Sequence, residues 1–401
     1  MRTVRAGLAA LVAVLIVGAC GSTTSPAVTH GVARSNGTAS QPGTPLASLS
    51  GSGSTAPLDI HLVPQAWTTP LLDTATDGSE IIWSKGGDTQ HGAPDIYAWT
   101  PGDPSPKLLV RGSDREAQAG PIAVHHGRYA FEEAIDHGPG NRGWRVWYIP
   151  AAGQKPLLVD TSATDPQSVA EVAPATWLAL TDDRLIWNAY HQSPSGPRFY
   201  LRSFDFKTGT TRNLLEADAA QTQYWFPNAD DEGRLVYSTI ERSGTDPAAY
   251  TYAYHVFLAQ VNTGPLQPRQ LDKDGRATEP VLRGDAVVWK RTDGSVSGWG
   301  NLERFTLTTG ALDDLDFDHQ SGVDDFTVGN RFVAAWLPDD TIFEVYDLQT
   351  GTNLLIEQYA PTSPKGVVRP EVGGDLLTFI RHDNFTNLQL CWTRLPPPSQ
   401  N

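Results

Sequence analysis

The sequence predicts an all-β protein, a seven-bladed β-propeller whose N-terminal strand closes the last blade, with six or eight blades as the alternatives. A turn followed by a short apolar strand that ends in an aromatic residue recurs at intervals of about 49 residues. Each repeat has room for four short strands, which is the content of one propeller blade. Glycine (37) and proline (30) are abundant, which fits many turns better than long helices.

The aromatic residue at the end of the recurring strand defines the repeat. Its seven occurrences are Trp83, Phe131, Trp187, Tyr237, Trp289, Trp336 and Phe379. Because the strand is otherwise apolar, we expect these side chains to pack in the core between blades. A Thr-Gly pair follows a later strand of four repeats, at Gly209, Gly264, Gly310 and Gly351. The same pair at the same place predicts one turn geometry, with glycine at a positive φ.

The propeller is predicted over residues 58–394, with a short tail at 395–401. The last repeat ends after 388–390 without a fourth strand, while the apolar segment 58–63 has no place in the first repeat. An unclosed ring would leave a bare strand edge, which favours aggregation. We therefore expect segment 58–63 to complete the last blade.

Residues 1–19 have the features of a bacterial signal peptide. Arg2 and Arg5 precede an apolar run over 6–17, which is too short to span a membrane comfortably. The run ends in Gly18-Ala19-Cys20, which resembles the lipobox of bacterial lipoproteins. The resemblance implies cleavage before Cys20 and lipidation of its sulfur. The alternative is a plain secretory signal with an incidental cysteine.

Residues 20–57 are predicted to be a lipidated flexible tether. Glycine, serine, threonine and proline fill 24 of the 37 positions in 21–57, so the segment has too little apolar surface to form a core. The sequence thus predicts an exported protein, lipid-anchored through Cys20 to the outer face of the bacterial cell membrane.

The formal net charge of −15 limits the possible partners. A nucleic-acid binder needs a basic surface to displace counterions, so no nucleic-acid partner is expected. An acidic protein is also repelled by anionic lipid, so the lipid on Cys20 must supply the membrane attachment. The expected partner is an envelope protein or glycan.

The repeats resemble those of TolB-type propellers. The resemblance rests on the buried strand that ends in an aromatic residue and on an Asp-x-x-Thr-Gly turn, found at 205–209 and 347–351. It implies a propeller fold, and a fold does not by itself determine a function.

A binding site is predicted on one face of the ring. The first-to-second and third-to-fourth turns of each repeat are short and share one face. The opposite face carries long second-to-third loops (84–94, 132–143, 189–198 and 238–254) and blade connections (159–173 and 216–223). Long loops on a rigid scaffold concentrate function. The candidate ligand-binding residues on this long-loop face are Glu133, His137, His191, Trp225, Trp299, Arg381 and His382.

Three functions remain open on the sequence alone. The favoured one is a propeller that binds or scaffolds a protein, peptidoglycan or glycan partner through the long-loop face. The alternative is an extracytoplasmic carbohydrate lyase or hydrolase, with histidines and carboxylates holding a divalent metal at the channel mouth. The third is a purely structural assembly component. No catalytic residue is assigned, and the histidines could equally be solvated loop residues and the tryptophans caps on hydrophobic clusters.

Overall fold

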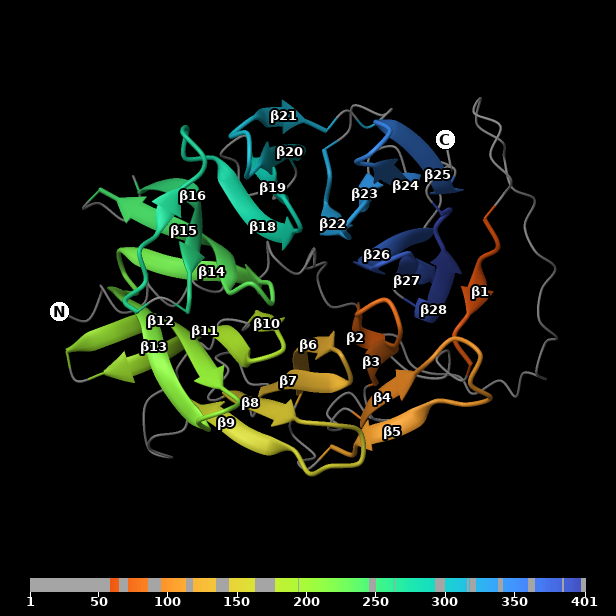
Figure 1. The fold of residues 1–401 in the computed structure, drawn as a ribbon, viewed down its shortest axis with the longest axis horizontal. Coiled ribbons are helices and arrows are strands. Elements are labelled where there is room, and N and C mark those ends of the chain that lie inside the picture. Colours follow the sequence, from red (N-terminus) through yellow and green to blue (C-terminus); the bar gives the residue numbers. More distant parts are fainter. Residues whose placement is uncertain are drawn as a thin grey trace, which may run out of the picture.

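The computed structural model describes residues 58–64, 71–85, 95–112, 118–134, 144–162, 177–193, 195–244, 250–262, 264–292, 300–315, 317, 322–337, 342–359, 365–383 and 386–397. These residues form seven four-stranded antiparallel sheets arranged around one axis (Figure 1). The predicted seven-bladed propeller is therefore confirmed. Cys20, the predicted signal peptide and the tether lie outside the described residues. Within the described ranges, no helix has the length and apolar character needed to cross a membrane.

Each blade runs from an inner strand, next to the axis, to an outer strand. The first blade comprises β2 (Leu71–Thr76), β3 (Ile81–Lys85), β4 (Asp95–Trp99) and β5 (Lys107–Val110). The second comprises β6 (Gln118–His125), β7 (Arg128–Ala134), β8 (Trp144–Ile149) and β9 (Leu157–Thr161). The third comprises β10 (Leu178–Leu180), β11 (Arg184–Ser193), β12 (Gly196–Asp205) and β13 (Thr210–Asp218).

The remaining blades follow the same order. The fourth comprises β14 (Thr222–Ala229), β15 (Arg234–Ser243), β16 (Thr251–Gln260) and β17 (Arg269–Gln270). The fifth comprises β18 (Ala277–Arg283), β19 (Ala286–Thr292), β20 (Gly300–Thr306) and β21 (Leu312–Asp314). The sixth comprises β22 (Asp325–Val328), β23 (Phe332–Leu337), β24 (Ile342–Asp347) and β25 (Thr352–Gln358). The seventh comprises β26 (Lys365–Gly373), β27 (Leu376–Asp383), β28 (Thr386–Arg394) and β1 (His61–Leu62).

The start of the propeller closes the ring, as the sequence predicts. Strand β1 pairs antiparallel with β28, with Leu62 opposite Cys391. The backbone N–H of Val63 donates to the carbonyl of Leu390 at 2.9 Å, and the Thr393 hydroxyl donates to the Asp59 carbonyl at 3.0 Å. Only two residues of the expected segment 58–63 form the strand itself. The flanking contacts of Asp59 and Val63 extend the seam, the junction between the start of the propeller and β28.

The core lies between neighbouring blades. All seven repeat aromatics are buried on the second strands of their blades, as predicted. Trp83 packs against Leu376 and Ile380 of the seventh blade, and Trp187 packs against Trp144 of the second. Each of these clusters mixes side chains from two adjacent sheets, so burial of apolar surface holds the ring together.

The Thr-Gly turns also have the predicted geometry. Gly209 has φ 65° and Gly351 has φ 68°. In the Asp-x-x-Thr-Gly turns, Asp205 accepts from the backbone N–H of Thr208 at 2.9 Å, and Asp347 accepts from that of Gln349 at 2.9 Å. The aspartate side chain thus fixes the turn that the glycine permits.

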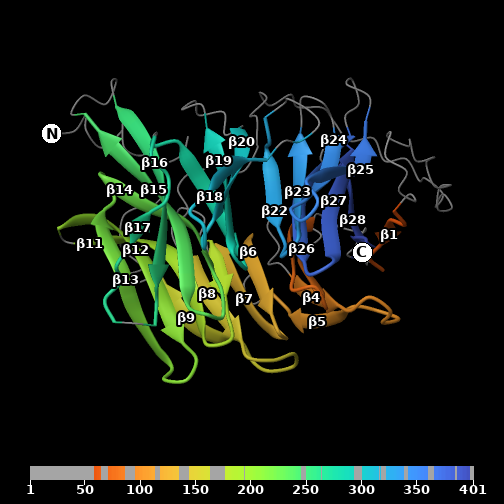
Figure 2. The same ribbon diagram turned by 45° about the horizontal axis from the view of Figure 1, so that its top comes forward.

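Three segments predicted as long loops or connections are mostly strand. Strands β11 and β12 continue to a tight hairpin, so 189–198 is largely paired. Strands β15 and β16 extend to Ser243 and Thr251 (Figure 2), and β13 reaches Asp218 before β14 begins at Thr222. In 238–254 tyrosine and threonine recur, and both residues favour strands. The third and fourth blades therefore present extended hairpins rather than long loops.

Candidate functional site

The structure describes five of the seven predicted ligand-binding residues, and it places all five on strands. Glu133 lies on β7, His191 on β11 and Trp225 on β14, while Arg381 and His382 lie on β27. His137 and Trp299 lie outside the described residues. The five residues belong to four blades.

Glu133 and His191 are packed among neighbouring side chains. Glu133 is 3% exposed and accepts a hydrogen bond from the Trp147 indole at 2.7 Å. The ring of His191 lies 5.2 Å from that of Trp144, in the adjoining second blade. Burial lowers the pKa of His191, and Arg202 acts in the same direction.

Trp225, Arg381 and His382 are likewise held by neighbours. Trp225 is 4% exposed in a cluster with Phe199, which is the cluster-capping arrangement left open by the sequence. Arg381 forms an ion pair with Glu357 of the sixth blade. His382 is 8% exposed and packs closely against β26. Glu133, His191 and Trp225 lie in different blades from one another and from the adjacent pair Arg381 and His382, and the part of all five in ligand binding remains a prediction.

The inner strands carry a feature that the sequence analysis missed, a β-bulge at an X-Pro pair. The bulges occur at Gly120-Pro121, Phe226-Pro227, Glu279-Pro280 and Arg369-Pro370. Phe226, Glu279 and Arg369 have φ of 51°, 55° and 53°, which is unusual for residues with side chains. Proline cannot donate to a sheet ladder, so a bulge is where a strand tolerates it.

Side chains of one inner strand bind the bulged backbone of the next. Asp73 accepts from the N–H of Ile122 at 3.0 Å, and Asp325 accepts from the N–H of Arg369 at 2.8 Å. The Asn228 side chain accepts from the N–H of Leu282 at 2.9 Å. Polar side chains are therefore built into the inner strands as links between blades, which explains why charged residues occur so close to the axis.

Charged residues from four blades gather on these inner strands. The group, called here the axial cluster, consists of Asp73 on β2, Glu279 and Arg283 on β18, Asp325 on β22, and Arg369 and Glu371 on β26. The Arg369 guanidinium lies 3.6 Å from Asp73, and Glu279 pairs with Lys290 at 2.7 Å. The side chains of Glu279 and Arg369 are 26% and 45% exposed, so solvent reaches the cluster along the axis.

Burial, and then repulsion between carboxylates, raise pKa values in the axial cluster. The pKa of Glu371 is raised to about 8, first because burial disfavours its charged form and then because Asp73 and Asp325 repel it. Arg283 and Arg369 oppose this rise without cancelling it. Burial also raises the pKa values of Asp73 and Glu279. A convergent group of ionisable side chains with perturbed pKa values is a candidate functional site.

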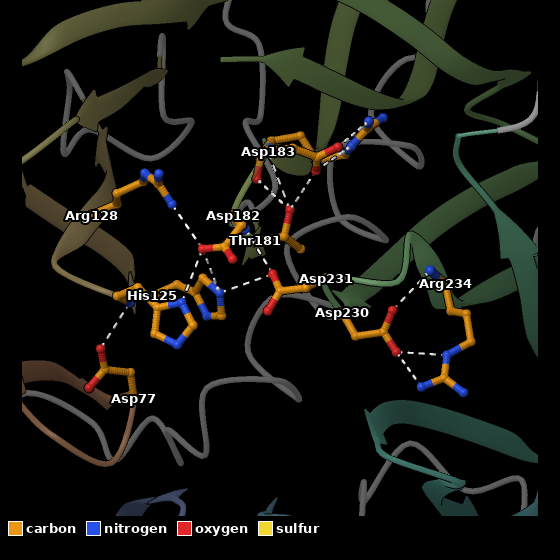
Figure 3. A network of polar contacts seen from close by, with 11 residues as sticks. Asp77, His125, Arg128, Thr181, Asp182, Asp183, Asp230, Asp231 and Arg234 are labelled. Atoms are coloured by element: carbon orange, nitrogen blue, oxygen red, sulfur yellow. Dashed lines mark hydrogen bonds and ion pairs between the residues drawn. The ribbon is translucent and has the colours of Figure 1, made fainter. Parts of the chain in front are cut away.

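A second polar group lies on the short-turn face, where the sequence analysis expected no site. It consists of His125 at the end of β6, His126 in the turn that follows, Asp182 between β10 and β11, and Asp231 between β14 and β15 (Figure 3). Asp77 and His126 are 49 residues apart, as are Asp182 and Asp231, so an alignment of the turns within the repeats would have brought these positions together.

Comparisons with known proteins show the fold and no family. Searches against protein-family models and against curated protein sequences found no match. Among solved structures, the chain is similar to the β-propeller domain of the Trilobed protease from Pyrococcus furiosus, which is described as having an open velcro topology. The identity is 10%, the TM-score is 0.58, and the match covers 82% of this chain and 99% of that domain.

Two further similar structures are a lyase and a TolB protein, the two kinds of protein considered in the sequence analysis. Oligogalacturonate lyase in complex with manganese matches with a TM-score of 0.51 at 12% identity, over 85% of this chain and 97% of the lyase. TolB from Acinetobacter baumannii matches with a TM-score of 0.42 at 13% identity, over 80% and 78% of the two chains, a likeness too low to support any inference. The chain spans about half the length of the prolyl endopeptidases it resembles. At these identities the likenesses establish a β-propeller and nothing finer.

Proposed function

We propose that the protein is an exported, lipid-anchored binding protein of the bacterial cell envelope, whose propeller accepts a cationic group of its partner at the axial cluster. The observation that carries this proposal is the convergence of Asp73, Glu279, Asp325 and Glu371 on neighbouring inner strands. An ammonium or guanidinium group offers such carboxylates charge-assisted hydrogen bonds.

The axial cluster lies near the middle of the inner strands, open to approach along the axis. Every inner strand begins at the long-loop face and ends at the short-turn face. Asp325 is the first residue of β22, while Asp73 and Glu279 are the third residues of β2 and β18. Glu371 is the seventh of the nine residues of β26, nearer the short-turn face, so the carboxylates span the middle of the inner strands and not one end. We place the partner's approach at the long-loop face because the sequence predicts the binding of a protein, peptidoglycan or glycan partner there.

The raised pKa of Glu371 gives this proposal a direct test. A bound cation favours the ionised carboxylate, so binding releases a proton near neutral pH. The probe is a tripeptide with a central lysine and blocked termini, compared with the same peptide acetylated on the lysine side chain. Calorimetric titrations in two buffers of different ionisation enthalpy measure the protons released.

The lysine peptide should bind and release protons, whereas the acetylated peptide should not bind. Glu371→Gln should abolish the proton release, and Glu241→Gln, at an exposed position on β15, should leave it unchanged. Equal binding of the two peptides, or no binding of either, would refute the proposed cation site.

The lipid anchor is tested separately by substitution of Cys20. Full-length protein expressed in a bacterium should incorporate labelled palmitate and partition with membranes, and Cys20→Ser should lose both properties. Cys391→Ser is the matched control, because Cys391 is a buried free thiol of the propeller. Membrane partition of Cys20→Ser equal to that of the unaltered protein would contradict the anchor.

A further inference from the structure

The turns that follow the inner strands of the first four blades lie in sequence around the axis on the short-turn face. Each turn contributes an acidic or histidine side chain. Hydrogen bonds from backbone N–H groups to aspartate side chains connect the first turn to the second and the third to the fourth. Asp77 accepts from the N–H of His126 at 3.0 Å, and Asp231 accepts from the N–H of Asp182 at 2.8 Å. The side chains are thus positioned by the ring of blades and not by one flexible loop (Figure 3).

Two histidines and two aspartates of this ring converge on one point. The Nδ1 atom of His126 lies 3.0 Å from Oδ1 of Asp182. The Nε2 atom of His125 lies 3.0 Å from Oδ1 of Asp231 and 3.5 Å from Oδ1 of Asp182. One potential ligand atom from each of the four residues lies within 4.8 Å of all the others.

The environment of His125 is a second observation that favours a bound cation. Its Nε2 atom is shielded from solvent and makes no hydrogen bond, although Asp231 lies 3.0 Å away. The geometry is therefore too poor for an N–H···O bond, and a ring nitrogen facing two carboxylate oxygens without such a bond is unfavourable. A cation held jointly by the nitrogen and the oxygens removes this cost.

We propose that His125, His126, Asp182 and Asp231 bind one divalent metal ion of the zinc type. Imidazole nitrogen and carboxylate oxygen bind Zn²⁺ at about 2.0–2.2 Å, which in tetrahedral geometry places ligand atoms about 3.3–3.6 Å apart. The contacts between the histidines and aspartates, at 3.0, 3.0 and 3.5 Å, lie at or slightly below this spacing, so small side-chain shifts would admit the ion. The ion joins the second, third and fourth blades at the short-turn face, away from the axial cluster.

Arg128 is the group that competes with the metal. Its guanidinium donates to the same Oδ1 of Asp182 at 3.0 Å. Its central carbon also lies 6.0 Å from the centre of the Phe206 ring, a contact that it can retain when it leaves Asp182. A bound ion would displace Arg128 from the carboxylate, so removal of this side chain should strengthen metal binding.

The test is a calorimetric titration of the tag-free, chelator-treated protein with ZnCl₂, repeated with CoCl₂ for its visible spectrum. We expect one ion per chain and a cobalt spectrum typical of mixed nitrogen and oxygen ligands. His125→Ala and Asp231→Asn should each weaken binding by about tenfold or more. Arg128→Ala should bind more tightly than the unaltered protein.

The control is His255→Ala, because His255 pairs with Asp272 at 2.9 Å on the fourth blade outside the proposed site. Circular dichroism checks the fold of each variant, and Asp231→Asn, which keeps the size of the side chain, replaces His125→Ala if the latter misfolds. Equal affinity in the His255 and Asp231 variants, or no saturable binding of either metal, would overturn the proposal.

Discussion

His61 and Trp392 lie opposite each other where the two ends of the propeller meet, with their rings stacked at a centroid distance of 4.6 Å. Trp392 also meets Trp99 of the first blade edge-on at 5.6 Å. The aromatic contacts of one residue thus connect β1, β28 and the first blade. Because β1 contributes only two strand residues, the stability of the seam depends on a few side chains.

Of the side chains where β1 meets β28, Val63 is the one whose truncation should lower the free energy of unfolding the most. It is 1% exposed and packs in a cluster with Leu71, Leu376 and Leu390. Val63→Ala should lower the free energy of unfolding by about 2 kcal/mol, through lost burial and the cavity left behind. The neighbouring Leu62 is 44% exposed, so Leu62→Ala should cost about 0.5 kcal/mol or less. Urea unfolding monitored by tryptophan fluorescence measures both, and similar losses would argue against the closed seam.

Glu133 should stabilise the fold through its hydrogen bond with the Trp147 indole, whether or not it also binds a ligand. Glu133→Ala removes the acceptor of the indole N–H and should cost about 1–3 kcal/mol, whereas Glu133→Gln retains an acceptor and should cost less. Glu303 accepts from the Trp289 indole at 2.7 Å in the fifth blade, so Glu303→Ala provides a matched comparison. Chemical denaturation of the four proteins, with the unaltered chain as reference, checks this order. A Gln variant as unstable as the Ala variant would show that the hydrogen bond contributes little.

The fold and the candidate sites differed in how far the sequence could reveal them. The blade count was predictable because a buried aromatic such as Trp187 or Trp289 recurs once per blade. The closure of the ring by segment 58–63 was predictable because the last repeat lacks a fourth strand of its own. The metal-binding group was missed because His125, Asp182 and Asp231 look like ordinary turn residues. They meet only because successive blades bring their turns together, and a linear sequence does not display that relationship.

The lengths of the loops were also difficult to predict from the sequence. Segment 238–254 has polar residues and a glycine, which suggested a loop, yet most of it pairs within β15 and β16. In the sequence, the turn signals of this segment outweigh the strand-forming residues on either side of the turn. The axial cluster was missed for a related reason, because charged residues beside proline, such as Glu279 and Arg369, do not resemble the interior of a strand.

Glu371 should make the propeller less stable as the pH rises. Its pKa is raised to about 8 in the fold, against 4.5 as the ordinary value, so between these values the native state holds a proton that the unfolded state has lost. The contribution of Glu371 to the free energy of unfolding is therefore fully present below about pH 4.5 and is lost as the pH rises through 8. Burial of the carboxyl is the main cause of the raised pKa, Asp73 and Asp325 add to it by repulsion, and Arg283 and Arg369 oppose it.

Glu371→Gln resembles the protonated form and should remove this pH dependence. The variant should match the unaltered protein at about pH 5 and unfold at a higher temperature at about pH 9. Thermal unfolding at the two pH values measures the difference, with Glu241→Gln as the exposed control. A variant that is less stable than the unaltered protein at the higher pH would contradict the raised pKa.

Gly373 and Gly78 bring the backbones of the seventh and first blades into direct contact. A Cβ atom added at Gly373 would lie 2.1 Å from the backbone nitrogen of Gly78, and one added at Gly78 would lie 2.6 Å from the carbonyl oxygen of Gly373. Neither backbone can yield without moving a blade. Gly373→Ala should therefore cost about 3 kcal/mol of unfolding free energy.

The adjacent Gly374 separates this steric effect from the general cost of replacing glycine. It has φ +56°, and a Cβ atom there would meet nothing within 4 Å. Gly374→Ala should therefore cost only about 1 kcal/mol, from the strained backbone conformation alone. Urea unfolding of the two variants tests the contact between the blades. If Gly374→Ala proved as damaging as Gly373→Ala, the close approach of the first and seventh blades would not be what requires glycine at this seam.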